Sequence, residues 1–181
     1  MKRLGRDAYL EQVLVGGREP RAIVIVDYDA SWPERFEAHR DRVARALGPI
    51  VCSIEHIGST AVPGLAAKPI IDVLVAVKDP DEESLMVPAL QAAGYHLRVR
   101  EPGHRMFRTP ERDVHIHVWQ DADPEIARHV RFRDRLRASG EDRAAYERLK
   151  RELATKRWDD MNQYADAKSQ LIEQILSRAS E

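Results

Sequence analysis

The sequence has little cysteine and no long apolar stretch. Its one cysteine, Cys52, excludes an internal disulfide framework and a CxxC metal cluster. Because Cys52 lies in an apolar run at residues 51–57, we predict a buried structural thiol. The first 17 residues contain only short apolar stretches interrupted by charged and amide side chains, so they form neither a signal peptide nor a membrane anchor. We therefore expect a cytoplasmic protein that does not engage a membrane.

The sequence also lacks an excess of positive or of negative side chains. The chain has 29 Lys and Arg against 30 Asp and Glu, so no overall field gathers nucleic acid or anionic lipid. Residues 124–157 hold eleven Lys and Arg against six Asp and Glu, but such runs more often form a solvated helix face than an RNA-binding surface. We expect no nucleic-acid partner, and any anion site must be local.

What is present predicts one globular α+β domain. With 181 residues, 43% hydrophobic and 33% charged, the chain can bury a single core beneath a charged surface. We predict an N-terminal extension over residues 1–21 and one domain over 22–181, with a sheet core at 22–123 and a helical tail at 124–181. Strands are expected at residues 22–26, 51–57, 69–77, 95–100, 105–109 and 113–119, and helices at 6–15, 32–47, 85–93 and beyond 124, with a break at Gly140.

The start of the helix expected at residues 32–47 carries a capping signal. Ser31 stands three residues before Glu34, and Pro33 falls in the first turn. This combination satisfies backbone amides that have no partner within a helix. The sequence therefore predicts that the Ser31 side chain caps this helix.

One acid stands in an apolar strand. Residues 70–77 are apolar on both faces except for Asp72, which predicts an inner strand covered on both sides. An unpaired buried carboxylate costs several kcal/mol. Asp72 should therefore have a partner or a ligand.

The loop before this strand has the residues of a phosphate site. Gly58 lets the backbone approach a phosphate closely, Ser59 and Thr60 offer hydroxyl donors, and Lys68 adds a positive charge. A carboxylate such as Asp72 could hold the Mg²⁺ that accompanies a triphosphate. Gly-Ser-Thr alone equally suits a turn, and Lys68 alone equally suits an exposed loop.

The stretch from Glu55 to Asp72 resembles the signature of the GrpB family, which also occurs fused to bacterial dephospho-CoA kinases. The strand at residues 114–118 and the run Phe132-Arg133-Asp134-Arg135-Leu136 resemble later blocks of that family. The resemblance implies a nucleotidyltransferase-like mixed sheet, in which a turn such as Gly58-Ser59 grips a nucleoside triphosphate. It also implies strand carboxylates that hold Mg²⁺ or Mn²⁺, and here Leu74 stands where a second carboxylate would follow Asp72.

A later strand offers further metal ligands. Asp113, His115 and His117 alternate and so share one strand face. Two imidazoles beside a carboxylate favour a transition metal over magnesium, but they could also donate to phosphate or act as general bases. They could equally be structural strand histidines.

Three more basic residues are candidate ligand contacts. Arg105, beside His104 after a Pro-Gly turn, could close over a phosphate through its planar fork. Lys150 and Lys168 lie on the helical tail, each four residues after a tyrosine. Together with the turn, Lys68, Asp72 and the two strand histidines, these residues predict one anion-binding pocket.

Three functions follow from these residues. The first is a metal-dependent nucleotidyltransferase that binds a nucleoside triphosphate and an acceptor the sequence does not identify. The second, favoured by Leu74, is a nucleotide-binding or scaffold module without catalytic carboxylates. The third is a metal-dependent phosphohydrolase using His115 and His117, although no further ligand pattern such as HExxH is present.

Overall fold

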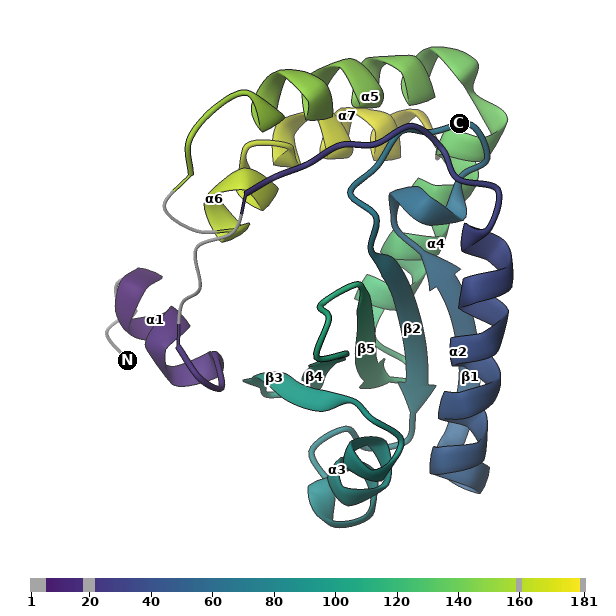
Figure 1. The fold of residues 1–181 in the computed structure, drawn as a ribbon, viewed down its shortest axis with the longest axis vertical. Helices are drawn as coiled ribbons and strands as arrows, with labels where there is room; N and C mark the ends of the chain where they lie inside the picture. The colour runs from purple at the N-terminus through teal and green to yellow at the C-terminus, as the bar shows by residue number, and fades with distance from the viewer. Residues whose placement is uncertain (1–5, 18–21, 159–160, 180–181) are drawn as a thin grey trace.

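The computed structural model describes residues 6–17, 22–158 and 161–179 and shows a five-stranded sheet with helices around it (Figure 1). The sheet has the order β1-β2-β5-β4-β3. Its strands are β1 (Val51–Ile57), β2 (Ile71–Val77), β3 (His96–Glu101), β4 (His104–Arg108) and β5 (Val114–Gln120). The helices are α1 (Arg6–Val13), α2 (Trp32–Leu47), α3 (Glu83–Ala92), α4 (Pro124–Ala138), α5 (Gly140–Ala154), α6 (Met161–Asp166) and α7 (Ser169–Arg178), with short 3-10 turns η1 (Gly48–Ile50) and η2 (Ser59–Ala61).

The sheet is mixed, as predicted. Strands β2 and β5 are parallel, whereas the pairs β1–β2, β4–β5 and β3–β4 are antiparallel. The tail is helical from Pro124, and the break predicted at Gly140 separates α4 from α5. In Figure 1, α5 and α7 lie side by side across one end of the sheet, while α1 lies near β3.

The two faces of the sheet differ in character because side chains alternate along each strand. On one face the main core gathers valines and isoleucines of β2 and β5 against apolar side chains of α2 and α3, including Phe36, Val43 and Leu90. On the other face stand Asp72 and Leu74 of β2, which pair in register with His115 and His117 of β5. Asp72, His115 and His117 therefore lie together on this second face.

Two strand predictions need correction. Residues 22–26 do not form a strand: Val26 makes only an isolated bridge to Ala67, and Val24 is 57% exposed, so nothing is buried by extending the pairing. Strand β2 begins at Ile71 rather than Pro69. Proline has no N–H to donate to a neighbouring strand, which favours a start beyond it.

Ser31 does not cap α2 with its side chain. Its backbone N–H donates to Asp29 Oδ1 at 2.8 Å, and its own φ and ψ are already helical, which turns the hydroxyl away from the amides of the first turn. Helices α4 and α5 do have side-chain caps, from Asp123 and Ser139.

Cys52 is exposed, not buried. Strand β1 is an edge strand of the sheet. Cys52 lies near the start of this strand, and its thiol is 3.8 Å from Asp121 Oδ2. The apolar run therefore predicted the strand correctly and the burial wrongly. Of the helices that the structure describes, none is both long and apolar enough to cross a membrane.

Candidate functional site

A cavity of about 230 Å³ opens between the Asp72 face of the sheet and the tail helices. Eight residues singled out in the sequence line it: Gly58, Ser59, Thr60, Lys68, Asp72, His115, Lys150 and Lys168. They come from the η2 turn and the loop that follows it, from β2 and β5, from α5 and from the α6–α7 junction. The fold therefore brings together residues that span more than 100 positions of the chain.

The sheet side of the cavity carries a set of three possible metal ligands. Ligand atoms of Asp72, His115 and His117 all lie within 4.8 Å of one another. Asp72 Oδ1 is 3.4 Å from His115 Nδ1 and 3.6 Å from His117 Nε2. The first separation is at the long limit for a hydrogen bond and the second is beyond it, whereas two ligand atoms roughly 2.1 Å from one tetrahedral ion lie about 3.4 Å apart. The three side chains thus fit a transition-metal ion.

The protonation preferences of this set also suit a cation. Burial raises the pKa of Asp72, but the neighbouring imidazoles of His115 and His117, when they are protonated, lower it more, so the carboxyl stays ionised far below its usual pKa. Burial lowers the pKa of His117, although Asp72 opposes that shift. An ionised carboxylate and a neutral imidazole are the forms that bind metals.

Gly58 allows the turn to pass directly over Asp72. Its φ is 72°, a conformation that favours glycine, and a Cβ at this position would lie 2.5 Å from Asp72 Oδ2. Any larger residue would collide with the carboxylate. Thr60 lies on the cavity wall, but its hydroxyl donates to the Ile70 carbonyl at 3.0 Å and contacts His56 Nε2 at 3.1 Å, so it holds the turn together.

Ser59 is joined to a buried lysine. Lys150 Nζ donates to Ser59 Oγ at 3.0 Å and also to the Ala66 carbonyl. Burial, with the positive charge of Lys168 nearby, lowers the pKa of Lys150 to about 7. Helix α5 thus places a titratable amine beside the Gly58-Ser59 turn, which the sequence predicts to bind phosphate.

Tyr164 lies between the other two lysines of the cavity. Lys168 Nζ is 4.5 Å and Lys68 Nζ is 5.0 Å from the centre of its ring. Burial lowers the pKa of Lys168 to about 8. The Tyr164 hydroxyl is buried and has no hydrogen-bond partner among the described residues, so a ligand in the cavity could accept from it.

Several lining residues were not selected from the sequence. They are Arg128, His129 and Phe132 on α4, Tyr146 on α5, Tyr164 on α6 and Ile172 on α7. Tyr146–Lys150 and Tyr164–Lys168 are each four residues apart and so share a helix face, a spacing that could have placed both tyrosines with their lysines. The α4 residues gave no comparable signal, because the direction in which α4 crosses the sheet is a tertiary property.

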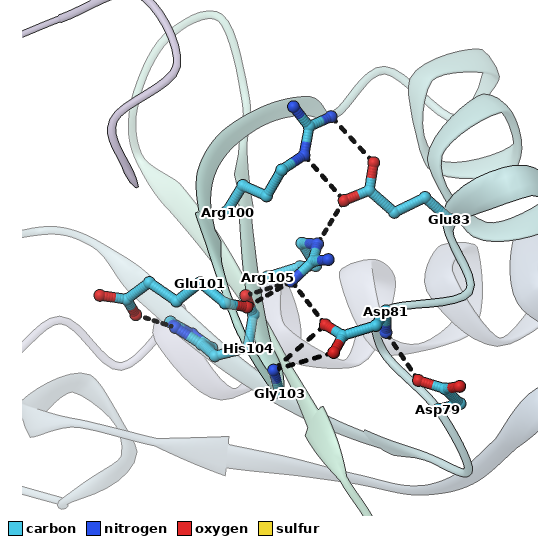
Figure 2. Close-up of polar contacts among 8 residues, drawn as sticks. All are labelled: Asp79, Asp81, Glu83, Arg100, Glu101, Gly103, His104 and Arg105. Carbon is cyan, nitrogen blue, oxygen red and sulfur yellow. Dashed lines mark hydrogen bonds and ion pairs between the residues drawn. The ribbon is translucent and has the colours of Figure 1, made fainter. Parts of the chain in front are cut away.

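Arg105 lies outside the cavity. It pairs in register with Val118 and so projects from the opposite face to His115 and His117. Its guanidinium binds Asp81 at 2.9 Å and also Glu83, which in turn binds Arg100 (Figure 2). The fork expected to hold a phosphate is already occupied by carboxylates at the start of α3.

Asp113 is not one of the grouped metal ligands. Its Oδ2 accepts from Arg35 on α2 at 2.8 Å, and its Oδ1 accepts from the Thr109 hydroxyl at 2.7 Å. Strand β5 begins only at Val114, so the alternation that governs His115 and His117 does not extend to Asp113. The side chain belongs to the β4–β5 turn.

Leu74 takes no part in metal binding. It is fully buried in a small cluster with Ile57 and Trp119, against which Ile126 of α4 packs. In this protein the position where the family resemblance implies a second carboxylate belongs to the interface between sheet and tail.

The family assignment rests on most of the chain. The GrpB protein family matches residues 22–178. The chain belongs to the GrpB family. A UPF0157 protein of Streptomyces coelicolor is 54% identical over 166 residues, which is 92% of this chain and 89% of that protein. The crystal structure of the conserved protein GrpB from Enterococcus faecalis is 34% identical, with a TM-score of 0.77 over 86% of this chain and 96% of that one.

The GrpB assignment confirms the α+β fold predicted from the sequence. A protein named dephospho-CoA kinase from Mycolicibacterium paratuberculosis also matches, at 27% identity over 86% of this chain and 45% of its own length. This partial match agrees with the expectation that GrpB-like domains occur within such kinases. The α1 helix precedes the part of the chain that the family covers.

Proposed function

We propose that this GrpB protein binds a nucleoside triphosphate in the cavity and, with the help of one divalent transition metal, transfers its nucleotidyl group to a nucleophilic acceptor with release of pyrophosphate. The observation that supports it is the position of Asp72, His115 and His117 in or beside the same cavity as Lys68, Lys150 and Lys168. The three possible metal ligands and the three lysines lie around a space that a phosphorylated ligand could fill.

The ligand types favour one ion such as Mn²⁺ or Zn²⁺ over a pair of Mg²⁺ ions. Imidazole suits transition metals, whereas Mg²⁺ prefers oxygen ligands and keeps several waters. Two-metal phosphoryl transfer needs a second group of carboxylates, and Leu74 is buried where one would stand. A bound ion would polarise a phosphate oxygen as a Lewis acid.

The chain's own side chains supply the rest of the proposed site. Ser59 Oγ and Lys150 Nζ, already 3.0 Å apart, would donate to one phosphate group. Lys168 and the Tyr164 hydroxyl would donate to another. The apolar and aromatic wall of Phe132, Tyr146 and Ile172 would take the nucleoside.

A second candidate is a nucleotide-binding module without transferase activity. It is favoured by the same Leu74 observation, because one remaining strand carboxylate weakens the case for catalysis. Both candidates require nucleotide binding, so they differ only in turnover.

The test combines binding and turnover in wild type and Asp72→Asn, with Asp41→Asn on the exposed side of α2 as the matched control. Thermal shift with each nucleoside triphosphate, with and without Mn²⁺, Zn²⁺ or Mg²⁺, measures binding, because a ligand of the native state raises the Tm. Pyrophosphate release in the presence of several acceptors measures nucleotidyl transfer, and phosphate release measures hydrolysis.

We expect Mn²⁺ or Zn²⁺ to raise the Tm of wild type and of Asp41→Asn but not of Asp72→Asn. Pyrophosphate release should fall by on the order of 100-fold or more in Asp72→Asn, because the charge that holds the ion is lost while the shape is kept. Binding without any release in wild type would favour the second candidate. Release undiminished in Asp72→Asn would exclude this catalytic assignment.

A further inference from the structure

A row of contacting side chains leads from the three possible metal ligands to the N-terminal helix α1. His117 Nδ1 lies 3.4 Å from His104 Nε2, and His104 Nδ1 lies 2.8 Å from Glu101 Oε2 (Figure 2 shows the second contact). The other carboxylate oxygen, Glu101 Oε1, accepts from the Tyr9 hydroxyl of α1. These contacts thus connect Asp72 through His117, His104 and Glu101 to Tyr9.

The rings in this row are held in place by stacking. His104 stacks on Trp119, its partner across the β4–β5 register, with ring centres 4.4 Å apart and planes 14° apart. The planes of His104 and His117 differ by only 6°, and their ring centres are 5.7 Å apart. Because the two nitrogens are much closer than the ring centres, the imidazoles meet edge to edge.

These contacts determine which nitrogens carry protons. A carboxylate can only accept, so the proton of the 2.8 Å contact lies on His104 Nδ1. A neutral His104 then has its lone pair on Nε2 and accepts from His117 Nδ1. A neutral His117 with its proton on Nδ1 presents the lone pair of Nε2 to Asp72.

The contact between His117 and Asp72 agrees with this direction. Nε2 and Oδ1 are 3.6 Å apart, which is too long for a hydrogen bond. Two acceptors that face one another at this distance repel, unless a cation lies between them. Histidine ligands of metals commonly donate their other ring N–H to a carboxylate or carbonyl, and here a second histidine relays that bond.

We propose that Glu101 and His104 are positioning residues that hold His117 in the Nδ1–H tautomer and so aim its Nε2 at a metal ion, and that Tyr9 of the N-terminal extension supports them. This inference rests on the metal site of the proposed function. Tyr9 precedes residues 22–178, which the GrpB family matches, so a segment before the matched part contacts the carboxylate behind His104.

The N-terminal helix is fixed well enough for this role. Leu10 and Val13 are buried, at 7% and 6% exposure, and Leu14 forms a bridge to Val99 of β3. The backbone N–H of Val15 donates to the Arg98 carbonyl at 2.9 Å. These contacts lie two and three residues from Glu101 along β3.

The test measures the tautomer and the metal affinity separately. In His104→Phe the ring that stacks on Trp119 is kept while both nitrogens are removed. His96→Phe, at an exposed position of β3, is the matched control, and Tyr9→Phe removes only the far end of the row. Proton–nitrogen correlation NMR of the metal-free protein reports the His117 tautomer, with its signals assigned from their loss in His117→Gln. Calorimetric titration with Mn²⁺ or Zn²⁺ gives the Kd.

We expect His117 to be mainly the Nδ1–H tautomer in wild type and His96→Phe, and to shift toward Nε2–H in His104→Phe. The metal Kd of His104→Phe should rise about 10- to 100-fold, with a smaller rise in Tyr9→Phe, while the Tm of the metal-free protein changes little. A wild-type His117 in the Nε2–H form, or an unchanged Kd and tautomer in His104→Phe, would overturn the inference. Absence of metal binding by wild type would overturn the proposed function instead, since the tautomer is read without metal.

Discussion

Two charged regions of this protein look alike in the sequence and differ in the structure. Around Arg105, each charge has an opposite partner: Asp81 and Glu83 bind Arg105, and Glu83 also binds Arg100 (Figure 2). In the cavity, by contrast, Lys150 lies near Lys168 and Lys68, and its amine donates to neutral oxygens of Ser59 and Ala66.

The difference separates a buried cation that binds carboxylates directly from a buried amine, Lys150, whose hydrogen bonds among the described residues go to neutral oxygens. A buried cation beside carboxylates is compensated within the protein, and burial then costs little. Buried cations that lie near one another stay close only because the fold forces them together, and an anion would relieve the repulsion. Arg105 should therefore matter for stability, and Lys150 should matter for binding.

The largest effect is expected from Arg105→Met. This change removes the cation that Asp81 and Glu83 share, at a side chain that is only 7% exposed, and leaves Glu83 with Arg100 alone. We expect the free energy of unfolding to fall by about 3 kcal/mol, measured by urea denaturation, with no change in anion affinity. Arg45→Met, at an exposed position of α2, is the control. A loss of anion binding without a loss of stability would contradict the comparison.

Lys150→Met should have the opposite pattern. It removes a buried amine that lies on the cavity wall, and hydrogen bonds to charged groups are worth about 1.5–3 kcal/mol. We expect the affinity for pyrophosphate or a nucleoside triphosphate to fall about 10- to 100-fold by calorimetry, while the free energy of unfolding at pH 7 falls much less than in Arg105→Met. Lys156→Met, at an exposed position just after α5, should leave both unchanged. Unaltered affinity in Lys150→Met would remove this lysine from the site.

The smallest effect is a pH dependence that should distinguish the two regions further. With the pKa of Lys150 lowered to about 7, the charged amine that favours an anion is lost as the pH rises. Sulfate, whose own charge is constant here, should bind about tenfold more weakly at pH 8 than at pH 6. Lys150→Met should lose most of this dependence and keep only the smaller part due to Lys168, whose pKa is about 8.

The lowered pKa of Lys150 should also make the stability of the protein depend on pH. The unfolded state binds more protons at Lys150 between about pH 7 and its usual pKa of 10.5, so this lysine makes the protein more stable as the pH rises through that window. Chemical denaturation of wild type and Lys150→Met at several pH values measures the contribution. A flat difference between the two proteins over this range would contradict the lowered pKa.

Local patterns predicted most of the secondary structure. Strands β1 and β5 and the change to helices at Pro124 follow from alternation and helical periodicity, which are properties of short segments. The errors arose where neighbours decide. Residues 22–26 look like a strand but have no edge to pair with, and Cys52 stands in an apolar run on an edge strand that leaves it exposed.

The candidate site shows the same division. The residue types and spacing of Gly58, Ser59 and Asp72 marked the phosphate turn and its acid, because a glycine at a close approach and an acid in an apolar strand are both visible in one dimension. Arg105 looked equally suitable for phosphate, and only the register with Val118 showed that it projects from the other face.

The sequence by itself determined the α+β class, the lone acid of β2, the alternating histidines of β5 and the Tyr–Lys pairs of the tail, since each depends on spacing within a single element. Tertiary structure alone decided that the tail's lysines meet the η2 turn, that Leu74 packs beneath α4, and that Glu101 and His104 lie behind His117. These relations join elements that are far apart in the chain. They depend on how helices cross the sheet and how strands pair, and no periodicity within one segment encodes that.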